Sequence, residues 1–263
     1  MSTFSKEHLA FIRAKKRKKR IILICQLLII ILFTIIWEYL VKKDIINSFL
    51  FSSPSNIVKC LINLYKSNNL IAHIKITIYE TLVSFGLANI IGIIVGSLLW
   101  WNKTCYKIFD PYLTIINSLP KVALGPLIII WVGASINSII FMALMISTII
   151  SIINIYNAFE SSDKNFITLM KTFKATKWQI YKKVIIPSNK LNIVNTFKIN
   201  ISMSLIGVIM GELLVSKKGL GYLIMYGSQV FNIDLVISSV LVLGIISYLM
   251  YYVIHCIEKK LTK

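Results

Sequence analysis

Six long apolar runs constrain this chain more than any other feature of its sequence. They cover residues 21–41, 77–101, 112–132, 136–159, 191–215 and 235–257. Each run is long enough for a helix of about 20 residues, which crosses the roughly 30 Å hydrocarbon core of a bilayer. The chain has 263 residues, 57% of them hydrophobic and only 15% charged, unlike an average soluble domain. The sequence predicts an all-α polytopic membrane protein with about six transmembrane helices.

The third apolar run is interrupted by two prolines, a glycine and a charged residue. These residues are Pro120, Pro126, Gly125 and Lys121. At membrane depth, freed backbone groups must be satisfied by neighbouring helices or by a wet cavity. We therefore expect this run to be packed inside the protein, after a loop that carries Lys103 and Lys107.

The formal net charge of +19 is distributed in blocks between the apolar runs. This pattern is typical of membrane topology and does not indicate a nucleic-acid-binding stripe. Lysine and arginine concentrate in the tail at residues 1–20, around residues 103–107, after residue 163 and at the C-terminus. The positive-inside rule places this face, with both termini, in the cytoplasm of a cell whose plasma or inner membrane holds the chain. We expect residues 1–20 to be a basic tail on anionic lipid headgroups and residues 21–263 to be one transmembrane domain.

The residues that carry chemistry in enzymes are sparse. The four cysteines and three histidines are dispersed, without the spacing of a metal site or a disulfide framework. The chain contains no G-x-x-x-x-G-K-[ST] phosphate-binding loop and no nucleophile, base and orienting group in a recognisable pattern. We therefore expect no enzymatic activity, no metal and no cofactor in this chain.

A basic segment at about residues 160–190, called here the basic loop, separates the fourth and fifth runs. Asp163 is a good helix N-cap. An apolar stripe at helical spacing follows, made of Phe166, Leu169, Met170 and Phe173. This pattern predicts a short amphipathic helix.

A second short helix is predicted after the first. Thr176 and Gln179 form the pattern of a capping box. The apolar side of this helix carries Trp178, Tyr181, Val184 and Ile185. Pro187 is expected to end it. Two such helices can lie among lipid headgroups or fill a groove on another protein.

The basic loop resembles that of ABC-transporter permeases of the binding-protein-dependent import class, with the pattern E-A-A-x3-G-x9-I-x-L-P. Val184, Ile186 and Pro187 occupy the I, L and P positions, and residues 175–180 resemble the stretch after the glycine. In that family the loop forms coupling helices that dock into the ATPase subunit. The resemblance implies a coupling role for Phe166, Leu169, Met170, Phe173, Lys174, Ala175, Thr176, Trp178, Tyr181, Val184, Ile186 and Pro187.

The basic loop also departs from the family pattern. Thr168 replaces the glutamate, Leu169 and Met170 replace the alanines, and Lys174 replaces the glycine. A glycine supplies a left-handed turn, which a lysine adopts only at a cost of about 1 kcal/mol or more. Either the turn is built differently here or the docking surface has diverged.

Further motifs extend the resemblance over nearly the whole chain after the tail. They are SSPSNI at 52–57, DPYL at 110–113, SLPKVALGPL at 118–127, WVG at 131–133, GELL at 211–214, GLGYLI at 219–224 and DLV at 234–236. Their order is similar to that of the permease branch for sulfonate, nitrate, taurine and bicarbonate.

Polar residues inside the apolar runs are candidates for function because they are costly in a membrane. Glu80 either influences which substrate charge the pathway accepts or is a carboxylate that extends to the membrane surface. In the fifth run, Asn200, Ser204, Gly207 and Gly211 share one helix face, which either packs a neighbouring helix or lines a pathway. We expect a pathway or dimer-interface role for Glu80, Asn195, Lys198, Asn200, Ser204 and Glu212. Lys198 and Glu212 lie about 21 Å apart along a helix and cannot pair within one chain.

The resemblance implies the permease subunit of an ATP-driven importer, working as a homodimer. An ABC ATPase subunit would hold the ATP, and an extracytoplasmic binding protein would deliver a small solute. Candidate solutes are anions of the sulfonate, nitrate or taurine kind and vitamin-precursor heterocycles. Two alternatives remain open from the residues alone: a secondary transporter driven by an ion gradient, and a membrane scaffold that recruits a cytosolic partner.

Overall fold

The computed structural model of the chain describes residues 6–67 and 69–261. Within these ranges every regular element is helical, which confirms the predicted all-α class. The elements are α1 (Lys6–Lys42), α2 (Ser48–Phe51), α3 (Pro54–Lys66), α4 (Asn69–Trp101), α5 (Lys103–Ser118), the 3-10 turn η1 (Lys121–Leu124), α6 (Gly125–Val132), α7 (Ile136–Glu160), α8 (Lys164–Thr172), α9 (Lys177–Ile180), the π-helical turn η2 (Tyr181–Ile185), α10 (Ile186–Ser188), α11 (Lys190–Val215), α12 (Leu220–Gln229) and α13 (Ile233–Leu261).

The helices reproduce the predicted spans with one exception. In the described residues, α1, α4, α7, α11 and α13 are each long and apolar enough to cross a membrane. The sixth span exists only if α5 is joined to η1 and α6, and these meet at a bend of 84°. Of the predicted basic tail, residues 6–20 are helical, and α1 runs unbroken from Lys6 into the first span; residues 1–5 lie outside the described residues.

The third span therefore differs from the predicted run at residues 112–132. Lys103 and Lys107 belong to α5 and not to a loop, because the Asn102 side chain accepts hydrogen bonds from the Thr104 and Cys105 amides at 3.0 and 3.3 Å. This cap starts a new helix one residue after α4 ends. Pro120 then separates α5 from η1.

The expectation that this run is packed inside the protein is also wrong for the single chain. In α6 only Gly125 and Ile128 are buried, whereas Ile130 and Trp131 are 76% and 73% exposed. Local helical bonds satisfy the backbone here, including one from the Ala123 amide to the Pro120 carbonyl at 2.8 Å. The bend thus needs no enclosing helices.

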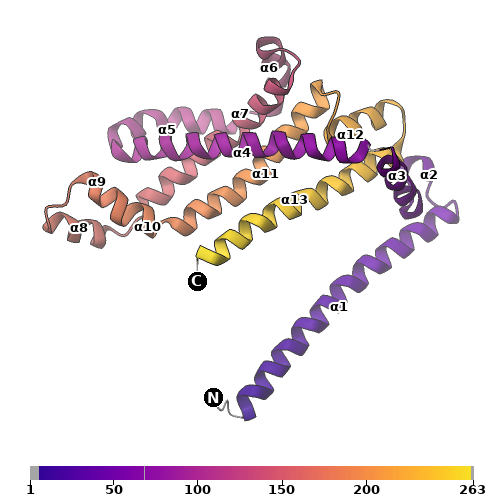
Figure 1. The fold of residues 1–263 in the computed structure, drawn as a ribbon, viewed down its shortest axis with the longest axis horizontal. Coiled ribbons are helices and arrows are strands. Elements are labelled where there is room, and N and C mark those ends of the chain that lie inside the picture. Colours follow the sequence, from indigo (N-terminus) through magenta and orange to yellow (C-terminus); the bar gives the residue numbers. More distant parts are fainter. Residues whose placement is uncertain (1–5, 68, 262–263) are drawn as a thin grey trace.

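The centre of the fold is α7, which packs between α4 and α11 (Figure 1). Glycines allow these close approaches. A Cβ on Gly211 would lie 2.9 Å from the Ile139 Cα, and one on Gly96 would lie 2.8 Å from the Ile155 Cγ2. For the glycines of the fifth run, the packing interpretation is therefore confirmed.

A second contact region lies at the end of the molecule where α2, α3 and α12 meet α13 (Figure 1). The SSPSNI motif forms the start of helix α3 in this region. Ser53 caps α3 by accepting a hydrogen bond from the Asn56 amide at 3.2 Å, and Pro54 is the first helical residue. The buried Ser52 hydroxyl bonds the Asp234 carboxylate at 2.5 Å, which ties this motif to the start of α13.

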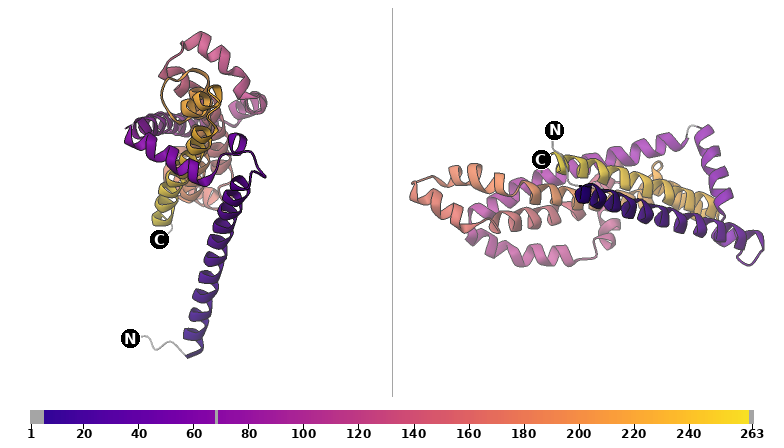
Figure 2. Two further views of the ribbon diagram at one scale, coloured as in Figure 1. Left: turned by 90° about the vertical axis from the view of Figure 1, so that its right-hand side faces the viewer. Right: turned by 90° about the horizontal axis from the view of Figure 1, so that it is seen from below.

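Helix α1 diverges from the rest of the molecule (Figure 2). None of its most apolar stretch is buried in the chain. It is attached near its C-terminal end, where Glu38 accepts a hydrogen bond from the Ser55 amide at 3.1 Å. Glu38 also pairs with Lys42 at 3.1 Å, one helical turn away.

Candidate functional site

The basic loop forms the two predicted short helices. The Asp163 side chain accepts a hydrogen bond from the Asn165 amide at 2.8 Å and caps α8. Thr176 and Gln179 form a reciprocal capping box at the start of α9, with bonds of 3.3 and 2.8 Å. Both caps were predictable because they depend on residues three or fewer positions apart.

The turn between these helices is left-handed, and Lys174 makes it. Its φ is +53°. The Ala175 amide bonds the Met170 carbonyl at 3.0 Å, and the Lys174 amide bonds the Lys171 carbonyl at 2.9 Å, which is a Schellman motif. The turn is thus built as a glycine would build it, which rules out the first of the two possibilities left open by the sequence, a turn built differently. The lysine bears the strain.

The apolar residues of α8 divide between two surfaces. Phe166, Leu169 and Phe173 are 57%, 52% and 74% exposed. Met170 is half-buried and, with Ile167, packs against the core cluster that contains Trp100. The first three residues are the exposed apolar side chains of α8, and the predicted fourth member belongs mainly to the core.

The apolar side predicted for the second short helix also divides between exposed and buried residues. Trp178 is 59% exposed, whereas Tyr181 is buried in the core, with its hydroxyl 2.7 Å from the Ser97 hydroxyl. Three further coupling candidates are half-buried and pack against the same cluster: Ala175, Val184 and Ile186. The exposed coupling candidates with large apolar side chains are therefore Phe166, Leu169, Phe173 and Trp178.

Pro187 does not end the second helix, contrary to prediction. It lies in the first turn of α10, after the π-helical turn Tyr181–Ile185. Pro lacks an amide hydrogen, and the first turn of a helix needs none at that position. The helical path continues through Asn189, whose side-chain amide donates to the Ser162 hydroxyl at 2.6 Å and the Ile185 carbonyl at 2.9 Å. Asn189 therefore links the end of the basic loop to its start at Ser162.

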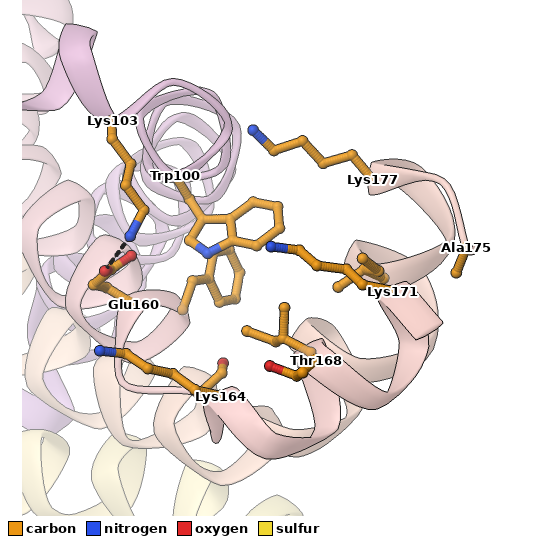
Figure 3. Close-up of a pocket in the computed structure, with 12 residues that line it drawn as sticks. Trp100, Lys103, Glu160, Lys164, Thr168, Lys171, Ala175 and Lys177 are labelled. Carbon is orange, nitrogen blue, oxygen red and sulfur yellow. Dashed lines mark hydrogen bonds and ion pairs between the residues drawn. The ribbon is translucent and has the colours of Figure 1, made fainter. Parts of the chain in front are cut away.

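A cavity of about 530 Å³ lies between α8, α9 and the ends of the long helices (Figure 3). Its charged lining residues are Lys103, Glu160, Lys164, Lys171 and Lys177. Lys103 pairs with Glu160 at 2.6 Å. The ends of α4 and α7 supply Trp100 and Phe159 as apolar walls.

The intramembrane candidates Glu80 and Glu212 meet inside the chain. Each is 1% exposed. Glu212 accepts hydrogen bonds from the Thr77 hydroxyl at 2.6 Å and from the Gly221 amide at 2.5 Å. The Glu80 side chain is hydrogen-bonded to that of Glu212. These bonds join α4, α11 and the start of α12.

The two glycines of the GLGYLI motif lie against Glu212. Gly219 has a φ of +114°, which favours glycine. A Cβ on Gly221 would lie 2.7 Å from the Glu212 Cβ. The GELL and GLGYLI motifs are therefore two halves of one packed contact.

The other intramembrane candidates are separated from this pair. The Asn200 side-chain amide donates a hydrogen bond to the side-chain oxygen Oδ1 of Asn89 at 2.7 Å, and Ser204 is fully buried. Asn195 is exposed and shares a shallow pocket with Lys198. Lys198 forms an ion pair with Glu258 and not with Glu212, as the spacing required. Their roles in a pathway or dimer interface stay predictions.

Sequence reasoning missed the partners of these groups. Thr77, Asn89 and Glu258 each bond a predicted residue from more than 50 positions away. One available signal was the stripe of small and polar side chains on α4, which are buried at Thr77, Glu80, Thr81, Ser84 and Ala88. These residues recur three, four and seven positions apart, which is the spacing of a single buried helix face.

Residues 88–263 match the family described as the inner-membrane component of binding-protein-dependent transport systems. The chain is 25% identical over 252 residues to the putative aliphatic sulfonates transport permease protein SsuC of Bacillus subtilis, which covers 96% of this chain and 91% of SsuC. It is 26% identical over 231 residues to the formylaminopyrimidine transport permease protein ThiX of Halalkalibacterium halodurans, covering 88% and 92% of the two chains.

The fold also has a solved counterpart. A chain of the MetNI methionine ABC transporter in an inward-facing conformation superposes with a TM-score of 0.67 at 23% identity, over 74% of this chain and 96% of that one. The family supports the importer interpretation and neither the ion-gradient transporter nor the scaffold. The chain therefore belongs to the inner-membrane components of binding-protein-dependent transport systems and is the permease subunit of an ABC importer.

Proposed function

We propose that this permease docks its ATPase on the exposed stripe of the basic loop, Phe166, Leu169, Phe173 and Trp178. The main observation in support is that these side chains project from two capped helices and remain 52% to 74% exposed. Exposed apolar residues grouped on one surface are typical of protein interfaces. An amphipathic helix in a groove is anchored by such residues at three- and four-residue spacing.

ATP bound on the partner subunit supplies the energy, and this chain needs no cofactor of its own. The basic loop, the start of α1 and the end of α13 lie toward the same end of the long helices (Figure 1), which supports a topology with both termini cytoplasmic. A second copy of the chain would complete the membrane path. Helix α1, unburied in the single chain, offers apolar surface to lipid or to that copy.

The solute is proposed to be a small organic anion or a vitamin-precursor heterocycle. The support comes from the relatives, one named for aliphatic sulfonates and one for formylaminopyrimidine. Candidates for the pathway and the dimer interface are Glu80, Asn195, Lys198, Asn200, Ser204 and Glu212. Of these, Asn195 is the exposed one and Lys198 lines the same shallow pocket.

The docking proposal is tested by purifying the tagged chain from its own cells and quantifying the ATPase that accompanies it. We expect Phe166→Asp, Leu169→Asp and Phe173→Asp to abolish stoichiometric recovery of the ATPase. Asn165→Asp and Thr172→Asp add the same charge to exposed positions of α8 outside the stripe and should leave recovery unchanged. Equal recovery from both sets of variants would refute docking on the stripe.

A further inference from the structure

The cavity beneath the basic loop has an excess of positive charge. Four lysines and one glutamate line it, a formal excess of three. Glu160 is already paired with Lys103. Among the residues that the structure describes, Lys164 and Lys171 form no ion pair. Like charges gathered in a partly enclosed space repel one another, and a bound anion would relieve that repulsion.

The lysines reach the cavity from three different elements. Lys103 comes from the start of α5, Lys164 and Lys171 from α8, and Lys177 from the start of α9 (Figure 3). Lys177 donates to the Trp101 carbonyl, and its ammonium lies 5.7 Å from the Trp100 ring. An anion in this space would therefore connect the loop helices to the ends of the spanning helices.

The position of the cavity favours a group at the membrane surface. Its walls are Trp100 at the end of α4 and Phe159 at the end of α7, the last turns of two membrane-spanning helices. The ring centroids of Trp101 and Trp178 lie 6.1 Å apart, so that tryptophans cluster beside the cavity. Tryptophan is enriched at the headgroup level of membranes, and basic pockets there bind anionic lipid headgroups.

We propose that this cavity binds a phosphate-bearing anion, the headgroup of an anionic phospholipid from the adjoining leaflet. The lysine ammonium groups would contact the phosphate oxygens. The hydroxyls of Ser162 and Thr168, which also line the cavity, could donate hydrogen bonds to them. The site stands on the cavity itself and does not depend on whether the exposed stripe docks an ATPase.

The test is native mass spectrometry of the full chain after detergent exchange, with phosphatidylglycerol or phosphatidylcholine added back. We expect the wild-type chain to retain phosphatidylglycerol in preference to phosphatidylcholine. Lys164→Gln with Lys171→Gln should weaken this retention about 30-fold, since each lysine contributes about a factor of five near an anionic surface. Lys182→Gln with Lys183→Gln is the matched control, because both lysines are exposed in the same loop and line no part of the cavity.

Two further arms separate the possible sources of the anion. Thr168→Trp fills the cavity without changing its charge and should also reduce lipid retention. In the second arm, inorganic phosphate is added at the same phosphorus concentration as the lipid. If phosphate displaces the lipid, and Lys164→Gln with Lys171→Gln weakens phosphate binding as well, the site is one for free phosphate. Lipid retention and phosphate binding that are both unchanged in Lys164→Gln/Lys171→Gln would overturn the proposal, whatever the state of ATPase recovery.

Discussion

The carboxylate of Glu212 lies 2.5 Å from the backbone amide of Gly221, nine residues further along the chain. The bond spans the loop between α11 and α12 and is buried. It explains why a glutamate near the end of one helix and glycines at the start of the next occur together. Glu212 accepts the hydrogen bond of an otherwise unpaired amide at a helix start.

Gly221→Ala is expected to destabilise this contact. The added Cβ would lie 2.7 Å from the Glu212 Cβ, and overpacking of this kind costs about 1–3 kcal/mol. The measurement is thermal unfolding of the purified chain in detergent, followed by tryptophan fluorescence. Gly86→Ala is the control, since nothing lies within 4 Å of a Cβ at that helical position. Equal melting temperatures for the two variants would contradict the packing described.

Gly211→Ala should separate α11 from α7. Its Cβ would lie 2.9 Å from the Ile139 Cα, a backbone atom that cannot move without the helix. We expect a lower melting temperature and faster amide exchange in α7. Gly244→Ala in α13 has open space around its Cβ and should behave as wild type. A stable Gly211→Ala variant would show that α7 and α11 are not packed at this point.

Lys174→Gly should stabilise the basic loop by about 1 kcal/mol, because glycine adopts the left-handed conformation without the strain that lysine has there. Amide exchange at residues 171–177 is the readout, and it should slow. Lys174→Ala removes the same charge but keeps the strain, so its exchange should remain as in wild type. Slower exchange in both variants would mean that charge, and not backbone strain, limits the loop.

Lys198→Met should lower the melting temperature of the chain, because it removes the ammonium partner of Glu258 and leaves that carboxylate with His255, 2.9 Å away. Lys198→Arg preserves the ion pair and should retain most of the stability. The measurement is again thermal unfolding in detergent. Lys190→Met changes an exposed lysine of the same helix and serves as control. A neutral effect of Lys198→Met would show that the pair is dispensable for folding.

The parts of this fold that depend on near neighbours could be predicted from the sequence. Asp163, Thr176 and Gln179 act within three residues, so their caps were predictable. The spans at α4, α7, α11 and α13 follow from apolar length. The left-handed turn at Lys174 was one of the questions that the sequence left open, because the family pattern has a glycine there and a lysine adopts this conformation only with strain.

The remaining features depend on contacts between distant segments. No local rule shows that Thr77 bonds Glu212, 135 positions away, or that Lys198 pairs with Glu258. The end of the second helix was mispredicted at Pro187, because the helical path continues from the π-helical turn into α10, where a proline in the first turn lacks no needed amide hydrogen. The resemblance implies a coupling role for Met170 and Tyr181, and in the structure both pack at the core cluster. Periodicity identifies an apolar face but not the surface that the face covers.

The most direct test of the central claim is site-specific photo-crosslinking in membranes of the native cell. Benzoylphenylalanine is placed at Phe173, which is 74% exposed on the stripe, or at Phe109, which is 52% exposed on α5. We predict an ATPase crosslink from position 173 and none from position 109. No ATPase product from position 173, or equal yields from both positions, would contradict the coupling function of the basic loop.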